Sequence, residues 1–141
     1  METSRSSRGK GARPLVRDAY LSYRDFNSFG MLRASAILSK CDDFLDDYLR
    51  KTNGVDLGKE WDFVLRRASV EFYRSVELGS SLTQLMRLGH LGETSFSIDY
   101  LFSEKNNRSV AASIVYVSIS AMTKSKVVTP PRIRSFIVEI G

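Results

Sequence analysis

The residues best suited to chemistry in this chain stand close together, at Asp25, Asn27 and Gly30, just before an amphipathic stretch. A carboxylate such as that of Asp25 can act as a nucleophile or as a general base toward water. The Asn27 amide can donate a hydrogen bond to a carbonyl oxygen or orient a water, but it takes up no proton near pH 7. Gly30 has no Cβ and lets another group approach the backbone closely. An acid, a hydrogen-bonding amide and an open stretch of backbone thus stand close together in the sequence.

An amphipathic helix is predicted over residues 34–50, directly after this segment. Its apolar residues follow the i, i+3, i+4, i+7 spacing and are Ala34, Ile37, Leu38, Cys41, Phe44, Leu45, Tyr48 and Leu49. On the polar face, Asp46 with Arg50 and Asp47 with Lys51 form i,i+4 pairs in the favourable orientation. Asn53-Gly54 supplies a stop signal. Because Cys41 lies on the apolar stripe, we predict that it is a core residue and not a nucleophile.

The rest of the chain is typical of β-strands. A strand-like run covers residues 15–25, and β-rich stretches cover 61–78, 81–91, 94–103 and 109–122. Residues 132–140, after two prolines, are expected to form a short strand or a helical turn. The order of one strand, one helix and four strands predicts an α+β domain. A single helix cannot cover both faces of a five-stranded sheet, so we expect the sheet to curl around it or a second subunit to cover the rest.

Composition indicates one domain with one sizeable core, since the chain has 141 residues and 43% hydrophobic composition. Much of the net charge of +5 lies near the start, in a Ser/Gly/Arg-rich stretch. We therefore predict a disordered basic tail over residues 1–14 and a domain over 15–141. A short organelle-targeting peptide, or a tail that docks on an anionic surface, is the alternative for this stretch.

Several classes of protein are disfavoured by what the sequence lacks. No apolar run approaches the roughly 20 residues that span a bilayer. A lone cysteine, Cys41, and a lone histidine, His90, argue against a disulfide framework and a His-rich metal site, and fit a reducing compartment. His90 stands near glycines and is predicted to face solvent in a turn. No aromatic–basic interleaving points to nucleic acid.

Residues 23–30, Tyr-Arg-Asp-Phe-Asn-Ser-Phe-Gly, resemble the strand-to-helix junction of hotdog-fold thioesterases of the 4-hydroxybenzoyl-CoA type. That family carries an acid-x-acid-x-x-Gly motif. Asp25 and Gly30 match it, whereas Asn27 replaces the second, usually catalytic, acid. Three further segments resemble the family in order: an aromatic-Arg strand and turn at 72–79, a turn opening the next strand at 88–96, and a proline turn at 129–131. The resemblance implies a hotdog fold, a curled antiparallel five-stranded sheet around one long central helix.

The resemblance also implies a thioester carbonyl at the N-terminus of that helix, where unpaired N–H groups stabilise an oxyanion. Asn27 and Gly30 would stand at this point. Asp25 is one candidate base, and Asp43 is another because it falls where related sequences often have a helix glutamate, with Asp42 beside it. Alternatively, the helix aspartates form a solvated face, and Asp25 caps the helix entry or pairs with Arg24 or Arg33.

For the substrate, the resemblance implies contacts with Met31, Ile37, Thr94 and Ser95. Met31 replaces the family's histidine and Ile37 its helix tyrosine, which makes the acyl pocket more apolar and suits a fatty or polyketide chain. The phosphates of a pantetheine carrier need cations. The candidates, which could also be solubilising charges, are Arg66, Arg67, Arg74, Lys124, Lys126, Arg132 and Arg134.

We therefore expect a cytoplasmic acyl thioester hydrolase acting on acyl-CoA or acyl-carrier-protein substrates, without a cofactor or a metal. Hotdog subunits leave a helix face and a sheet edge for a partner, so a homodimer or homotetramer is expected. Some polyketide-pathway relatives carry asparagine at the corresponding place, so Asn27 does not by itself imply inactivity. The alternative is a non-catalytic hotdog module that binds an acyl thioester or serves as an oligomeric scaffold.

Overall fold

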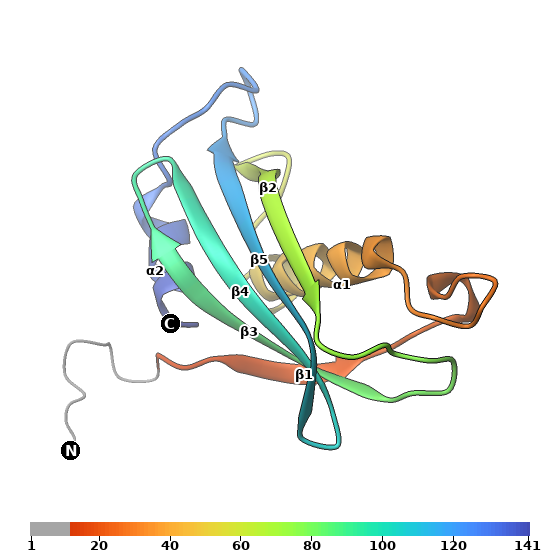
Figure 1. Ribbon diagram of the computed structural model, residues 1–141. Helices are drawn as coiled ribbons and strands as arrows, with labels where there is room; N and C mark the ends of the chain where they lie inside the picture. Colours follow the sequence, from red (N-terminus) through yellow and green to blue (C-terminus); the bar gives the residue numbers. More distant parts are fainter. Residues whose placement is uncertain (1–11) are drawn as a thin grey trace, which may run out of the picture.

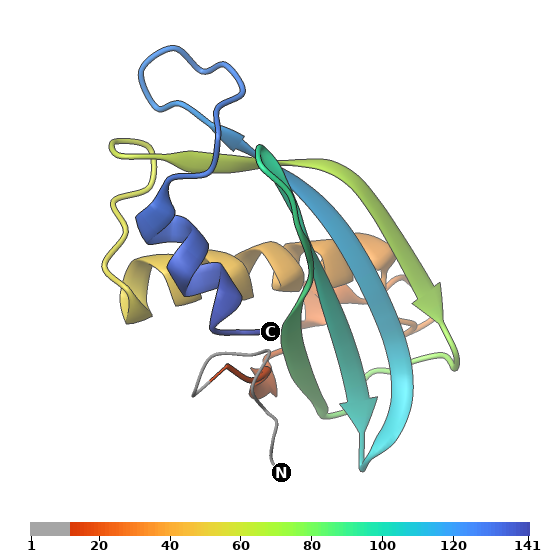
Figure 2. The same ribbon diagram turned by 90° about the vertical axis from the view of Figure 1, so that its left-hand side faces the viewer.

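The structure is a computed structural model that describes residues 12–141. One curled sheet forms most of the molecule. The strands are β1 (Leu15–Ala19), β2 (Asp62–Phe72), β3 (Leu82–Leu91), β4 (Ser95–Glu104) and β5 (Asn107–Ile119). Their order is β1-β3-β4-β5-β2, and all neighbours are antiparallel. Helix α1 (Ala34–Asp47) crosses the concave side of this sheet (Figure 1; Figure 2). The predicted α+β class and five-stranded antiparallel sheet are confirmed.

The predicted amphipathic helix is confirmed and ends slightly later. After α1, the chain continues as π-helical turns, η2 (Tyr48–Thr52), before Gly54 with a φ of +70°. The apolar stripe is buried, with Ile37, Cys41 and Leu45 at 0% exposure. The expected ion pairs along the polar face are present, at 3.1 Å for Arg50 Nε to Asp46 and 3.4 Å for Lys51 Nζ to Asp47.

Alternation along β4 places the core between the sheet and α1. Phe96, Ile98, Tyr100 and Phe102 are buried, at 2% exposure or less. They point toward the helix, because Tyr100 bonds to Tyr116, which in turn bonds to α1. The intervening residues of β4 lie half-buried on the convex face. This alternation follows the pattern predicted from the sequence.

Two predicted strands are shorter in the structure. The run over 15–25 ends at Ala19, and Asp25 lies in a 3₁₀ turn, η1 (Tyr23–Asp25). The stretch over 61–78 ends as a strand at Phe72. The turn predicted at His90 is instead part of a strand: His90 lies within β3, next to a bulge, and its side chain is exposed as predicted. Gly89 occupies the bulge, where there is no room for a side chain because an added Cβ would lie 2.6 Å from Ser97 Oγ.

A second helix, α2 (Pro131–Val138), takes the place of the predicted short strand or helical turn. Pro131 suits the first helical position, where an N–H would have no partner. Ile133, Ile137 and the following Ile140 are buried, and Tyr48 Oη donates to the Phe136 carbonyl at 2.6 Å. Figure 2 shows α2 on the same side of the sheet as α1, so two helices share that face.

Of the predicted basic tail, residues 1–11 lie outside the described residues. Just after them, the Arg13 N–H donates to the Glu139 carbonyl at 2.9 Å, which ties this part of the chain to the end of α2. No helix within residues 12–141 has the length and apolar character needed to cross a membrane.

Candidate functional site

The turn before α1 is built by the side chain of Asn27. Asn27 Oδ1 accepts hydrogen bonds from the N–H groups of Phe29 (2.9 Å) and Met31 (3.0 Å). Its backbone carbonyl accepts from the Gly30 N–H at 2.9 Å. An asparagine that bonds to the backbone two residues on is a turn-forming residue. Since two donors face Oδ1, the amide's NH₂ group is the part of this side chain left for a ligand.

Gly30 is required in this turn by its conformation. Its φ is +77°, in the left-handed region that glycine adopts without steric cost. The nearest atom to a Cβ built there is Leu78 Cβ at 3.9 Å, an ordinary contact. Glycine is therefore needed at position 30 for its backbone conformation and not for lack of space.

A second segment, residues 73–80, pairs with this turn. The Leu32 N–H donates to the Val76 carbonyl at 2.8 Å, and the Leu78 N–H donates to the Gly30 carbonyl at 2.9 Å. Met31 and Glu77 form an isolated antiparallel bridge between these bonds. Two segments that the sequence singled out separately thus lie side by side.

Between these segments lies a pocket of about 300 Å³, here called the Asn27 pocket. It is lined by Asn27, Met31, Leu32, Phe72, Arg74, Ser75 and Val76. The lining combines apolar side chains with one amide, one hydroxyl and one guanidinium. Such a mixture suits a largely apolar ligand with a few polar groups.

The start of α1 adds backbone donors near this pocket. The N-cap residue, Arg33, makes no side-chain capping bond, and its carbonyl accepts from the N–H groups of Ala36 (3.1 Å) and Ile37 (3.4 Å). The first N–H groups of a helix have no partner within it, and the helix dipole makes this end positive. Ala34 and Ser35 therefore offer N–H groups to an acceptor, four and five residues after Gly30.

Asp25 is committed to the neighbouring 3₁₀ turn. Its Oδ2 accepts from the Ser22 N–H at 2.7 Å and lies 3.7 Å from Lys40 Nζ. It therefore caps η1, and its ion-pair partner is Lys40 on α1, not Arg24 or Arg33. The carboxylate does not line the Asn27 pocket.

Asp42 and Asp43 are adjacent in sequence but differ in environment. Asp43, the sequence-based candidate, is exposed and lies in a polar groove with Arg17 and Lys40. Asp42 is half-buried, and its Oδ1 accepts from Tyr116 Oη at 2.9 Å. Burial raises the pKa of the Asp42 carboxyl above its usual range; the Tyr116 hydrogen bond opposes this rise, and Asp43 and Asp46 add to it. Asp42 follows Leu38 by four residues, which places it at the border of the apolar stripe. This spacing could have indicated that its side chain is half-buried.

The tyrosine that bonds to Asp42 extends the network into the core. Tyr116 Oη lies 3.0 Å from Tyr100 Oη, and burial raises the pKa of both phenols above their ordinary value. Cys41 is fully buried beside them on α1, and burial raises the pKa of its thiol too. The two tyrosines and Asp42 form a hydrogen-bonded network in which Tyr116 is the donor to the helix.

The predicted substrate contacts separate in the structure. Met31 is 42% exposed and lines the Asn27 pocket, whereas Ile37 is 0% exposed within the core. Thr94 and Ser95 stand at the turn between β3 and β4, where the Thr94 carbonyl accepts from Ser118 N–H at 2.9 Å. Figure 1 shows this turn at the opposite end of the molecule from the loop that precedes α1. Within one chain, Thr94, Ser95 and Ile37 do not line the pocket.

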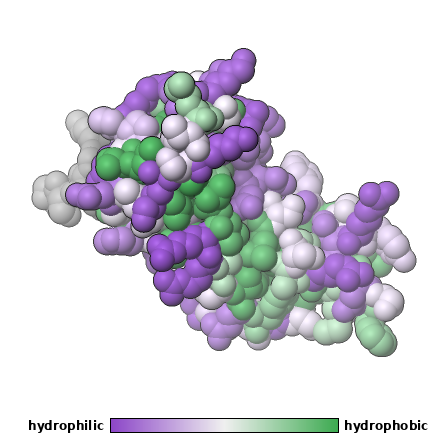
Figure 3. Space-filling model, turned by 90° about the horizontal axis from the view of Figure 1, so that it is seen from above, coloured by the Kyte–Doolittle hydropathy of each residue, from purple (hydrophilic) through white to green (hydrophobic). Residues whose placement is uncertain are grey.

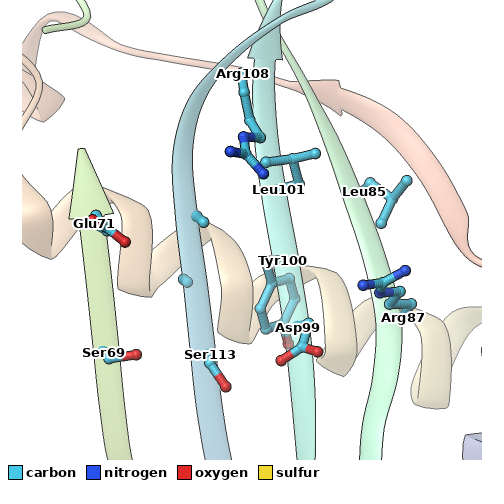
Figure 4. Close-up of a pocket in the computed structure, with 11 residues that line it drawn as sticks. Ser69, Glu71, Leu85, Arg87, Asp99, Tyr100, Leu101, Arg108 and Ser113 are labelled. Carbon is cyan, nitrogen blue, oxygen red and sulfur yellow. The ribbon is translucent and has the colours of Figure 1, made fainter. Parts of the chain in front are cut away.

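A larger hollow, about 420 Å³ in volume, lies on the convex face and is here called the convex hollow. Its lining is Ser69, Glu71, Leu85, Arg87, Asp99, Tyr100, Leu101, Arg108, Ala111, Ala112 and Ser113. Figure 4 shows the labelled side chains on strands β2 to β5, with α1 behind the sheet. Ser69, Ser113, Asp99 and Arg87 stand in one register row across the sheet. Sequence reasoning did not indicate this hollow, because it depends on register between strands.

No three His, Cys, Asp or Glu side chains within residues 12–141 are grouped so that they could hold a metal ion. The polar side chains that line the Asn27 pocket are instead an amide, a hydroxyl and a guanidinium, donors that can polarise a carbonyl or bind an anion.

Solved structures with the same architecture include several thioesterases. The chain superposes on the PA5185 protein from Pseudomonas aeruginosa PAO1 with a TM-score of 0.81, at 17% identity over 89% of this chain and 90% of that one. For Slr0204, a 1,4-dihydroxy-2-naphthoyl-CoA thioesterase from Synechocystis, the TM-score is 0.73 at 18% identity, covering 88% and 95%. For a thioesterase from Thermus thermophilus complexed with coenzyme A and Zn, it is 0.74 at 21% identity, covering 88% and 93%.

These similarities show that the chain has the hotdog fold that the resemblance implied, with a curled five-stranded sheet. The single long central helix of that expectation is replaced by α1 with its π-helical end, which shares the sheet face with α2. No model of a known protein family matches the chain, and no curated protein matches it either.

Proposed function

We propose that the protein hydrolyses acyl thioesters of coenzyme A or of an acyl carrier protein, with the thioester bound at the Asn27 pocket. The observation that carries the proposal is the position of this pocket beside the start of α1. The Asn27 amide lines this pocket with mostly apolar side chains, and Leu32, also in the lining, stands two residues before Ala34, where α1 begins with N–H groups that have no partner within the helix. The fold is also that of thioesterases, one of which was solved with coenzyme A.

In this proposal the substrate's carbonyl oxygen accepts hydrogen bonds at the helix start and from the Asn27 amide. One such preorganised donor is worth about 10²–10³ in rate. The described residues that line the pocket include no carboxylate, so the attacking water gives its proton to a residue of a second copy or to solvent. Losing a positioned base costs about 10²–10⁴ in rate, and we expect slow turnover.

A second copy also has a place to bind. β2 is a long edge strand paired with β5 on one side, and Val64 and Leu65 on it are 49% and 41% exposed. Figure 3 shows apolar side chains gathered in a band across one face of the molecule, with hydrophilic ones on both sides. A long exposed edge is a template for strand pairing, which favours a homodimer or homotetramer.

The second candidate is a non-catalytic module that binds an acyl thioester or serves as a scaffold. Two observations favour it: Asn27 Oδ1 is already occupied by backbone donors, and the pocket lining lacks a carboxylate. This candidate differs from the first in predicting binding of coenzyme A thioesters without turnover.

Hydrolysis of acyl-CoAs of increasing chain length separates the two candidates, measured for the wild type, Asn27→Ala and Asn27→Asp. The proposal predicts turnover by the wild type and a fall of about a hundredfold to a thousandfold in Asn27→Ala, since a donor is lost. Asn107→Ala, at the exposed start of β5, is the matched control and should equal the wild type. Absence of turnover at every chain length, with none gained in Asn27→Asp, would overturn the hydrolase and leave the binding module.

A further inference from the structure

Arg74 holds a distinct position among the cations that the sequence offers to a phosphorylated carrier. Of the described residues that line the Asn27 pocket, it is the one with an ionisable side chain. Two others of the predicted set are engaged elsewhere: Arg132 pairs with Glu60, and Arg134 donates to the Gly92 carbonyl at 2.7 Å.

The backbone around Arg74 is held in place while its side chain is left free. The Tyr73 N–H donates to the Ser109 carbonyl at 2.8 Å, and the Arg74 N–H reaches the same carbonyl at 3.4 Å. Two residues later, the Val76 carbonyl accepts from Leu32. Within the described part of the chain, no carboxylate lies within ion-pair distance of the Arg74 guanidinium. By contrast, the guanidinium of nearby Arg108 stacks on the Tyr73 ring, 4.5 Å from its centroid.

A guanidinium without a counterion, beside apolar walls, favours an anion with two oxygens, because its fork matches phosphate and carboxylate geometry. The neighbouring polar groups, the Asn27 amide and the Ser75 hydroxyl, are neutral donors that suit the same partner. We propose that Arg74 binds an anionic group of the substrate within the Asn27 pocket. The inference rests on the proposed function for the identity of the substrate. The anion is then the phosphate of the pantetheine arm or a carboxylate on the acyl group.

Four substrates separate these two sources: butyryl and succinyl thioesters, each on coenzyme A and on N-acetylcysteamine, which lacks the phosphate. They are compared for the wild type, Arg74→Gln, Arg74→Lys and the control Arg87→Gln in the convex hollow. If phosphate is the partner, Arg74→Gln raises KM at least tenfold for both coenzyme A thioesters, with kcat little changed, and Arg74→Lys restores part of the loss. If carboxylate is the partner, the rise follows the succinyl group on either carrier.

Calorimetric binding of coenzyme A, and of succinate against the uncharged butyramide, gives a readout that needs no turnover. Loss of coenzyme A or succinate affinity in Arg74→Gln, in a protein that hydrolyses nothing, would support the anion site while the hydrolase fails. Unchanged KM and affinity within twofold for all ligands, or an equal loss in Arg87→Gln, would overturn the role of Arg74. Matching thermal unfolding curves for the variants show that the comparison is made on folded protein.

Discussion

Two hollows of this molecule, the convex hollow and the Asn27 pocket, differ in their backbone and charges more than in their volumes. The convex hollow is the larger, about 420 Å³ against about 300 Å³ for the Asn27 pocket. Its floor, however, is the sheet itself, where the N–H and C=O groups of neighbouring strands bond to each other. The smaller pocket lies where a turn, a loop and a helix start meet, and helix starts leave N–H groups without partners. Free backbone donors, more than volume, indicate where a carbonyl would bind.

The charges of the two hollows differ as well. The convex hollow carries both signs, with Arg87 and Arg108 against Asp99 and Glu71. The Asn27 pocket carries Arg74 alone. In the convex hollow the positive and negative side chains compensate each other's charge, whereas the lone guanidinium of Arg74 favours an anionic ligand.

The largest expected loss of stability distinguishes a core residue, Ile37, from a residue that lines the convex hollow, Leu85. Ile37→Ala removes a fully buried side chain from α1 and should lower the free energy of unfolding by about 2–4 kcal/mol. Leu85→Ala, on the half-buried wall of the convex hollow, should lower it by about 1 kcal/mol or less, since solvent already reaches that side chain. Urea denaturation measures both. A loss below about 1 kcal/mol for Ile37→Ala would mean that Ile37 is free to contact substrate, as the sequence suggested.

Two glycines, one beside each hollow, should respond to alanine for different reasons. At Gly89 the added Cβ would lie 2.6 Å from Ser97 Oγ, so overpacking should lower stability by about 1–3 kcal/mol. At Gly30 there is room, but the φ of +77° is left-handed and should cost about 1–2 kcal/mol.

A second substitution at each site distinguishes the two causes. Ser97→Ala should restore part of the stability lost in Gly89→Ala, because it removes the atom that the Cβ meets. Leu78→Gly, which removes the Cβ nearest to that position, should restore nothing in Gly30→Ala. Rescue of Gly30→Ala by Leu78→Gly, measured by thermal unfolding, would show that crowding and not backbone conformation makes Gly30 necessary.

The smallest effect concerns pH and the two adjacent aspartates. The pKa of Asp42 is raised in the folded protein, so the folded state binds this proton more tightly than the unfolded chain does. Its contribution to stability is therefore present below the unfolded pKa, about 3.9, and is lost as pH rises through the higher folded value. The groups facing it are Tyr116 on β5 and the neighbouring Asp43 and Asp46 on α1.

Asp42→Asn replaces the titrating carboxyl with an amide that does not titrate, and keeps an oxygen that can accept from the Tyr116 hydroxyl. The variant should gain in melting temperature relative to the wild type as pH rises from 4 to 7. Asp43→Asn, one residue along on the exposed face, removes one of the two charges that add to the rise, so its melting temperature should move in the same direction by a smaller amount. A constant difference between Asp42→Asn and the wild type across this range would contradict the raised pKa.

The sequence predicts the elements well where local periodicity decides them. The alternation at Phe96, Ile98, Tyr100 and Phe102 and the apolar stripe of α1 come from side-chain spacing alone, and both are found in the structure. For α2 the sequence predicts a short strand or a helical turn without deciding between them, because this short segment is fixed by contacts such as that of Tyr48 with Phe136.

The site was predicted in part. The turn at Asn27 and Gly30 and the segment around Arg74 were identified as separate segments, and the structure brings them together. Which of Asp42 and Asp43 points inward depends on where Tyr116 of β5 lies, and this is tertiary information. The same holds for Ile37, whose helical position does not tell core from pocket.

Mapping of a hydrolysis-resistant acyl-CoA analogue by NMR, in which a methylene separates the sulfur from the carbonyl, tests the central claim most directly. If the thioester binds at the Asn27 pocket, the backbone amide shifts should change most over residues 27–36 and 72–76. Changes confined instead to residues of the convex hollow, such as Ser69, Arg87, Asp99 and Ser113, would contradict it.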